Sequence, residues 1–229
     1  MSTEARHSSE SNEFYTPPEI VEPFRTVLGG FDLDPASCEL ANTIVRATTF
    51  YSLDLSDLTT NGLSPSRPWA GNVILNPPGG LVDRDGRPVF VATKKRKSCS
   101  ETGACGLPPG HKHEGVTSSA KAFWRRAARE YATGNVRQVA FVGFSVEVMQ
   151  SAQSGAGEDE ITPLHAPFCL PEKRVSYLVP DADGELAPMR GNTHSSVLVY
   201  LPDRDHYDRS LRRFADAMSS LGRCAQPLM

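Results

Sequence analysis

One tetrapeptide carries groups that suit a specific chemistry. Asn76-Pro77-Pro78-Gly79 directly follows NVIL (residues 72–75), a short apolar run expected to form a buried strand. The two prolines fix φ and lack N–H donors, so their carbonyls remain as acceptors, and Asn76 adds an amide oxygen. Because ligands sit at the carboxyl ends of strands in open α/β sheets, this loop is predicted to accept both hydrogens of a substrate amine. The alternative is a plain turn, which Asn-Pro often starts.

A second group of residues matches the ligands of a metal ion. Cys99, Cys105, His111 and His113 are spaced C-x5-C-x5-H-x-H within residues 80–118, a stretch without apolar periodicity. Zinc takes four cysteine or histidine ligands and stabilises segments that have no core of their own. The pattern therefore predicts a zinc site, although its spacings differ from the common shorter ones. The alternative is a long loop that holds these residues by chance.

Basic residues gather in two places in a slightly acidic chain. The net charge is −3 over 229 residues, which by itself argues against a nucleic-acid-binding protein. The run Lys94-Lys95-Arg96-Lys97 lies inside the same stretch, and Trp124 and Arg125 belong to a second cluster. We expect both clusters to contact the phosphates of double-stranded DNA. Ordinary solvated charge is the alternative.

The surrounding sequence alternates between helix and strand patterns. Helices are expected at residues 16–30, 38–47, 120–134 and 207–222. Strands are expected at residues 31–35, 72–75, 136–144, 174–179 and 195–201. This order predicts an α/β fold whose mostly parallel sheet ends in an antiparallel hairpin of the last two strands. Residues 1–12 are expected to be a disordered tail, and residues 13–222 a single domain with an insertion or long loop at about 80–118.

Three short motifs stand in order between residues 14 and 79. Phe14-Tyr15-Thr16-Pro17-Pro18 comes first, Asp32-Leu33-Asp34-Pro35-Ala36 second, and Asn76-Pro77-Pro78 third. Asn61-Gly62-Leu63 and Trp69 lie between the last two. Together they resemble the T-P-P, D-P-A, D-G-L and N-P-P segments of the phage and prophage family of DNA adenine N6-methyltransferases. The resemblance is strongest over residues 13–80 and continues faintly to residue 201.

The resemblance implies a Rossmann-like class I fold, S-adenosylmethionine as cofactor and roles for particular residues. Tyr15-Thr16-Pro17 is expected to contact the methionine end of the cofactor. Asp32, Asp34 and Pro35 are expected at the cofactor pocket, and either Asp54 or Asp57 at the ribose or adenine of the cofactor. In the catalytic motif, Asn76 and the Pro77 carbonyl are expected to orient the amine of an adenine flipped out of the duplex.

The chain departs from the family in two places. An aromatic normally follows N-P-P and stacks on the flipped base, whereas this chain has Gly79, so we expect Phe90, Phe123 or Trp124 to replace it. Ala36-Ser37-Cys38 stands where the family has a glycine-rich loop. Three alternatives therefore remain open: methylation of cytosine N4, methylation of a protein glutamine, and a non-catalytic nucleic-acid-binding module with this fold.

Composition indicates the compartment. No apolar run reaches the length needed to cross a bilayer, and the N-terminus lacks the apolar segment of a secretory signal. The five cysteines are an odd number without a dense pattern, which fits a reducing environment. We therefore expect a cytoplasmic protein that does not bind membranes.

Overall fold

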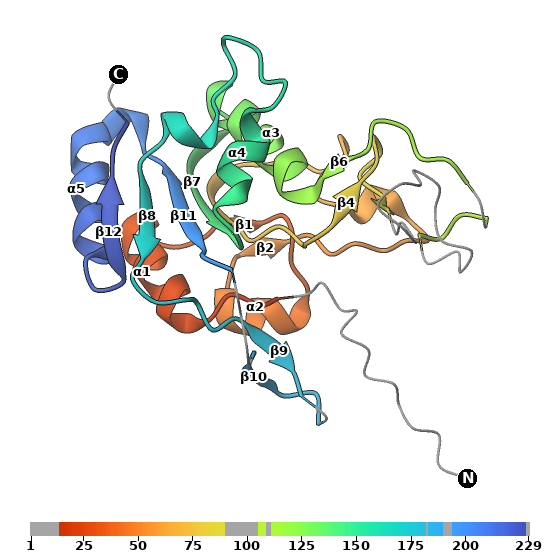
Figure 1. Cartoon of the computed structure of the whole chain (residues 1–229), viewed down its shortest axis with the longest axis horizontal. Helices are drawn as coiled ribbons and strands as arrows, with labels where there is room; N and C mark the ends of the chain where they lie inside the picture. The colour runs from red at the N-terminus through yellow and green to blue at the C-terminus, as the bar shows by residue number, and fades with distance from the viewer. Residues whose placement is uncertain (1–13, 90–104, 109–110, 182, 190–193, 228–229) are drawn as a thin grey trace.

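A seven-stranded sheet forms the centre of the computed structural model, which describes residues 14–89, 105–108, 111–181, 183–189 and 194–227 (Figure 1). The helices are α1 (Pro18–Leu28), α2 (Glu39–Val45), α3 (Ser119–Ala132), α4 (Glu147–Gln153) and α5 (Tyr207–Met218). The strands of the central sheet are β1 (Leu33–Asp34), β2 (Thr49–Phe50), β3 (Gly71–Leu75), β7 (Val136–Gly143), β8 (Phe168–Pro171), β11 (Val197–Leu201) and β12 (Gly222–Ala225). The expected tail, residues 1–12, lies outside the described residues.

The strand order in the central sheet is β12-β8-β11-β7-β3-β1-β2. The pairs β2/β1, β1/β3 and β3/β7 are parallel. The pairs β7/β11, β11/β8 and β8/β12 are antiparallel, so β8 again runs the same way as β7. The molecule is therefore α/β with a mostly parallel central sheet, and only β11 and β12 run against the rest.

Helices cover both faces of the sheet. On one face, α1 and α5 bury Phe24 and Phe214 against Ile74 of β3 and Tyr200 of β11. On the other face, α3 and α4 form a second core with β3, β7 and β11, which includes Trp124. The helix predicted at 120–134 is confirmed as α3, and its expected apolar face is buried. Residues 16–30, 38–47 and 207–222 likewise contain α1, α2 and α5, each somewhat shorter than expected.

The predicted terminal hairpin is wrong. β11, within the expected 195–201 strand, pairs with β7 and β8, and residues 174–179 do not join the sheet. Their last two residues begin β9 (Leu178–Pro180), which pairs with β10 (Leu186–Pro188) in a separate small sheet. Tyr177 explains the difference, because its side chain is fully buried in the core and its hydroxyl lies 3.0 Å from Ser196 Oγ. Residues 174–179 therefore pack against the core through side chains. β8 occupies the place beside β11 that was expected for these residues.

Residues 80–118 are not simply a loop where the structure describes them. β4 (Leu81–Val82) pairs antiparallel with β5 (Pro88–Val89) and with β6 (Thr117–Ser118), giving a three-stranded sheet in the order β5-β4-β6. Strands of two residues are too short to produce an alternating pattern, so periodicity could not reveal them. This small sheet lies between β3 and α3 in the chain and extends to one side of the central sheet (Figure 1).

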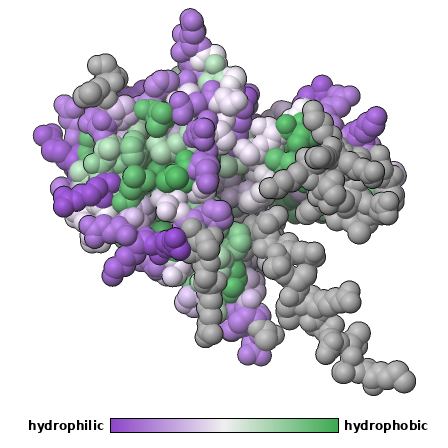
Figure 2. Space-filling model, viewed as in Figure 1, coloured by the Kyte–Doolittle hydropathy of each residue, from purple (hydrophilic) through white to green (hydrophobic). Residues whose placement is uncertain are grey.

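The outer surface is largely hydrophilic on the face shown in Figure 2, with apolar side chains gathered over β8, β11 and β12. There Leu170 of β8 is 43% exposed, because α3 and α4 pack over β7 and leave this sheet edge uncovered. Among the residues that the structure describes, no helix has the length and apolar character needed to cross a membrane.

Candidate active-site cleft

A cleft of about 440 Å³ opens where the strand order reverses. From β1 the chain moves outward to β2, whereas β3 lies on the opposite side of β1. This reversal is the position at which open α/β sheets bind ligands, outside the carboxyl ends of the strands. The cleft is lined by parts of all three sequence motifs. They are Phe14, Tyr15 and Thr16 before α1, Asp34, Pro35 and Ala36 after β1, and Asn76, Pro78 and Gly79 after β3.

Asn76 is held in a single orientation at the end of β3. Its Nδ2 donates to the carbonyl oxygen of Phe14 at 2.7 Å. Because that carbonyl can only accept, the amide oxygen of Asn76 must point the other way. Among the described residues no donor contacts this oxygen. Among the described residues, Asn76 therefore presents an uncommitted acceptor at the cleft.

Asp34 is a carboxylate with little solvation. It is 4% exposed at the end of β1, and its Oδ1 accepts a hydrogen bond of 3.2 Å from the Ala36 N–H. Burial raises the pKa of Asp34 to about 7, although hydrogen bonds from the Ala36 amide and the Ser37 side chain lower it. No cationic side chain among the described residues pairs with Asp34, and a buried carboxylate of this kind is suited to a ligand that carries positive charge.

The segment before β3 forms one wall of the cleft. A Cβ on Gly62 would lie 1.8 Å from the Pro35 carbonyl oxygen, so only glycine allows this approach. Trp69 Nε1 donates to the Gly62 carbonyl at 2.9 Å, and Asn61 Nδ2 donates to the Gly86 carbonyl at 2.7 Å. The Asn61-Gly62 pair thus joins the cleft to the small β4 sheet.

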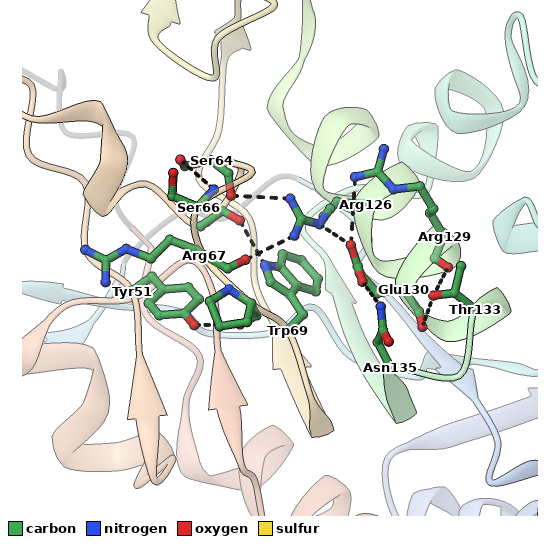
Figure 3. A network of polar contacts seen from close by, with 12 residues as sticks. Tyr51, Ser64, Ser66, Arg67, Trp69, Arg126, Arg129, Glu130, Thr133 and Asn135 are labelled. Carbon is green, nitrogen blue, oxygen red and sulfur yellow. Dashed lines mark hydrogen bonds and ion pairs between the residues drawn. The ribbon is translucent and has the colours of Figure 1, made fainter.

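Arg126 anchors this wall to α3, as Figure 3 shows. Its guanidinium donates to the Arg67 carbonyl at 3.0 Å and to the Ser64 carbonyl at 3.4 Å. It also pairs with Glu130 at 2.7 Å and lies 5.6 Å over the Trp69 ring. A buried arginine with these partners has a structural role, because it satisfies carbonyls that no strand or helix uses.

Phe14, whose carbonyl holds Asn76, belongs to a cluster of aromatic rings. Phe14 is half-buried, lines the cleft and stacks on Phe144 with ring centroids 4.8 Å apart and planes 12° apart. Phe144, just after β7, also contacts Tyr177 at 5.0 Å. Sequence reasoning did not identify Phe14 and Phe144 as site residues. Their signal was an aromatic residue directly before Tyr15 and another at the end of a strong strand.

Of the aromatics expected to replace the one missing at Gly79, Phe123 lines the cleft and is 4% exposed. Trp124 is fully buried, with its Nε1 donating to the Ile161 carbonyl at 2.9 Å, so its predicted contact with a base or with DNA is wrong. Phe90 lies outside the described residues.

Three acidic residues expected at the cofactor do not line the cleft. Asp32 is exposed and accepts from the Asn72 N–H at 2.7 Å, where it secures the start of β3. Asp54 and Asp57 are exposed, and their carboxylates accept from Ser56 and Thr59 within local turns. Both positions follow β2 closely, but the turns direct these carboxylates to their own backbone. The structure therefore gives no support to the predicted cofactor contacts of Asp32, Asp54 and Asp57, which stay predictions.

Two prolines of the motifs support the site without lining it. Pro17 is buried at the N-cap of α1. Pro77 is buried between Asn76 and Pro78, which both line the cleft. Each fixes the backbone on which a lining residue stands.

Arg125, in the second basic cluster, makes contacts within the protein. Arg125 pairs with Glu160 at 2.7 Å and donates to the Gly155 carbonyl at 2.6 Å. Its predicted contact with DNA phosphates is therefore not supported. The run Lys94-Lys95-Arg96-Lys97 lies outside the described residues.

The residues predicted to bind zinc are only partly described. Cys99 lies outside the described residues, whereas Cys105, His111 and His113 belong to the small β4 sheet and its loops. The imidazoles of His111 and His113 meet edge to face with centroids 5.1 Å apart. Within the described residues, no three histidine, cysteine or acidic side chains are grouped as a metal site.

Comparisons with known proteins give no relative for this chain. No family model matches it, and neither the curated proteins nor the solved structures contain a significant match.

Proposed function

We propose that this chain is an S-adenosylmethionine-dependent methyltransferase that acts on an amino group, and specifically on the N6 amine of adenine in DNA. The observation that carries the proposal is the orientation of Asn76. Its amide nitrogen donates one hydrogen bond to the Phe14 carbonyl, and its oxygen is left for a substrate donor in the same cleft as Asp34.

The cleft has the properties expected of the cofactor site. Its volume of about 440 Å³ falls within the range typical of small-molecule pockets. S-adenosylmethionine, when bound, supplies a methyl group on a positively charged sulfur. Asp34 provides the complementary negative charge, Thr16 and Ser37 provide hydroxyls, and Tyr51 and Leu53 provide apolar surface.

The amine needs acceptors more than it needs a base. Asn76 Oδ1 accepts one amine hydrogen. The family resemblance assigns the other to the Pro77 carbonyl, although Pro77 itself is buried behind the residues that line the cleft. Two such bonds direct the nitrogen lone pair away from the acceptors, which orients the amine before the reaction. Oriented dipoles of this kind cost no reorganisation when charge develops on the nitrogen.

Adenine in DNA is the preferred substrate because of the motif order described above, from Phe14-Tyr15-Thr16 through Asn76-Pro77-Pro78. A base in a duplex must leave the stack to reach such a cleft. The described aromatic residues that line the cleft are Phe14, Tyr15, Tyr51 and Phe123. Phe14 is the one of these that is not buried, so it is the candidate to stack on the base.

The decisive experiment incubates the protein with tritiated S-adenosylmethionine and unmethylated duplex DNA, and then identifies the labelled nucleoside. We expect N6-methyladenine. Asn76→Ala should slow transfer by roughly 10²–10³-fold and leave the cofactor dissociation constant, measured by calorimetry, nearly unchanged. Asn135→Ala is the matched control, because Asn135 donates to Glu130 and, among the described residues, is not part of the cleft lining.

The same assay separates the alternatives. If the label is found in N4-methylcytosine or in protein glutamine, the substrate assignment changes and the proposed mechanism stands. DNA binding without cofactor binding would indicate a non-catalytic module. Full activity in Asn76→Ala would remove this loop from the reaction.

A further inference from the structure

The first residue of α3, Ser119, carries a buried hydroxyl without a hydrogen-bond partner. Ser119 is 1% exposed and belongs to the lining of the cleft, so it lies at the floor of the cleft and not at its rim. Within the part of the chain that the structure describes, no group bonds to its Oγ. A buried polar atom without a partner costs free energy, so its retention at a cleft calls for a ligand that supplies the partner.

The backbone fixes Ser119 beside the loop that carries Asn76. The Ser119 N–H donates to the carbonyl of Gly80 at 3.0 Å, and Gly80 ends the loop that Asn76 begins between β3 and β4. The preceding residue, Ser118, is the N-cap of α3, and its Oγ accepts from the Lys121 N–H at 3.3 Å. Since Ser118 caps the helix, the Ser119 hydroxyl is not needed to hold α3 in place.

The part of the cleft around Ser119 carries no charge. Asp34, at the end of β1, is the only acidic side chain in the described cleft lining, and no basic side chain occurs in that lining. The small β4 sheet and α3 contribute apolar side chains, which are those of Leu81, Val82, Pro88, Val89 and Phe123. This part of the cleft is therefore suited to a flat, neutral group and not to a phosphate or a carboxylate.

Two polar side-chain groups remain for such a ligand. Asn61 also lines the cleft, but its Nδ2 donates to the Gly86 carbonyl at 2.7 Å and its Oδ1 accepts from the Leu63 N–H at 2.9 Å. The two groups are the Asn76 oxygen, which only accepts, and the Ser119 hydroxyl, which can donate. The N-terminus of α3 carries partial positive charge, which favours an acceptor atom of the ligand at Ser119.

An acceptor and a donor in one cleft match the edge of a base that has an exocyclic amine. The N6 amine of adenine lies between two ring nitrogens, N1 and N7, which both accept hydrogen bonds. With the amine on Asn76, a neighbouring ring nitrogen is complementary to the Ser119 hydroxyl. The base would thus satisfy the one group that the ligand-free protein leaves unsatisfied at this floor.

We propose that Ser119 is a specificity-determining residue, whose hydroxyl donates to N1 or N7 of the target adenine. The assignment rests on the proposed function, because it takes the target amine to be held by Asn76. A base that lacks this ring nitrogen leaves the buried hydroxyl unpaired in the complex and is rejected for that reason.

The test measures methyl transfer by wild type and Ser119→Ala to a duplex that contains the sequence methylated by wild type. The target position holds adenine, 1-deazaadenine or 7-deazaadenine. We expect wild type to lose roughly 3–10-fold in kcat/KM on one of the two analogues, and Ser119→Ala to lose about as much on adenine. On that analogue Ser119→Ala should lose nothing further, because the bond is already absent. Losses that multiply on both analogues would overturn the assignment.

The neighbouring serine provides the matched control. Ser118→Ala removes the cap of α3, so it should lower Tm and change transfer by the same factor on all three bases. Ser119→Ala should leave the Tm of the ligand-free protein unchanged or raise it, because it removes an unsatisfied hydroxyl. A fall in Tm as large as that of Ser118→Ala would give Ser119 a structural role and refute the proposal.

The outcomes distinguish this assignment from the function on which it rests. If wild type transfers no methyl group to adenine in DNA, the proposed function fails and the assignment fails with it. If wild type methylates adenine and Ser119→Ala does so at the same rate, the proposed function stands and the role of Ser119 is refuted.

Discussion

Replacing Asp34 with Asn should stabilise the ligand-free protein and weaken cofactor binding. The unfolded carboxyl ionises near 3.8 and the folded one near 7, so between these pH values the folded state keeps a proton that the unfolded state has lost. Stability therefore falls as pH rises through this window. The full shift of about three pKa units corresponds to about 4 kcal/mol at pH 8, and to about 2 kcal/mol at pH 5.

The Tm difference between Asp34→Asn and wild type is compared at two pH values, because any effect of the Asn amide itself is the same at both. Its change with pH therefore reports the ionisation of Asp34. For a chain of this size, the excess Tm of Asp34→Asn over wild type should widen by roughly 5–10 °C from pH 5 to pH 8. Thermal unfolding followed by circular dichroism checks this. A Tm difference that does not change with pH would show that Asp34 is well solvated and would refute the argument.

Asp203→Asn is the matched control, with the opposite sign. Burial raises the pKa of Asp203, but hydrogen bonds from Arg137 and the Asp205 amide, together with the Arg137 charge, outweigh it and lower the pKa below its usual value. The stabilisation this gives is present above the usual pKa and is lost only at more acidic pH. Asp203→Asn should therefore lower Tm about equally at pH 5 and pH 8.

Cofactor binding to wild type should show the reciprocal effect. A cationic ligand favours ionised Asp34, so binding releases a proton below pH 7. The dissociation constant should fall up to tenfold per pH unit as pH rises to about 7, and then level off. Calorimetry in buffers of different ionisation enthalpy measures the released proton, and a pH-independent dissociation constant would contradict the role of Asp34.

Three other predictions concern the core, a buried thiol and the basic run. Trp124→Ala should cost roughly 3–5 kcal/mol in urea unfolding, and a loss of DNA affinity without destabilisation would contradict its burial. Burial raises the pKa of Cys169 to about 12, so iodoacetamide at pH 8 should leave it unmodified until the protein unfolds, as mass spectrometry can record. Replacing Lys94-Lys95-Arg96-Lys97 with alanines should flatten the log–log salt dependence of DNA binding by roughly two to four units, whereas Arg125→Ala should leave it unchanged.

The sequence could predict those parts of the cleft where residue type and position at the end of a strand indicate the same role. Asn76 stands directly after a short apolar run, and Asp34 is the last residue of the short strand β1. The end of a parallel strand faces the ligand side regardless of the rest of the fold. These two residues could be assigned to the cleft without knowledge of contacts with distant parts of the chain. The buried face of α3 was predictable for a similar reason, since helical spacing alone determines which side chains share a face.

Roles that depend on a partner far along the chain were not predictable. Trp124 and Arg125 looked like a basic cluster with an aromatic, but their partners, Ile161 and Glu160, belong to a loop more than thirty residues away. The carboxylates of Asp54 and Asp57 are used by their own turns, which spacing cannot distinguish from a ribose-binding position. Tyr177 lies in a strand-like pattern, yet its burial removes the segment from the sheet.

The bond between Asn76 and Phe14 also bears on how the protein is made. Phe14 comes from the first segment of the domain, and the neighbouring Tyr15 pairs through its backbone with Leu178 near the other end. Asn76, Tyr15 and Leu178 therefore belong to three pieces of chain that leave the ribosome at very different times. A nascent chain that has passed residue 76 holds the Asn76 amide but lacks the Leu178 backbone that pairs with Tyr15, a residue of the cleft lining. We therefore expect translation products that end before residue 178 to bind a small ligand in the cleft more weakly than the full chain.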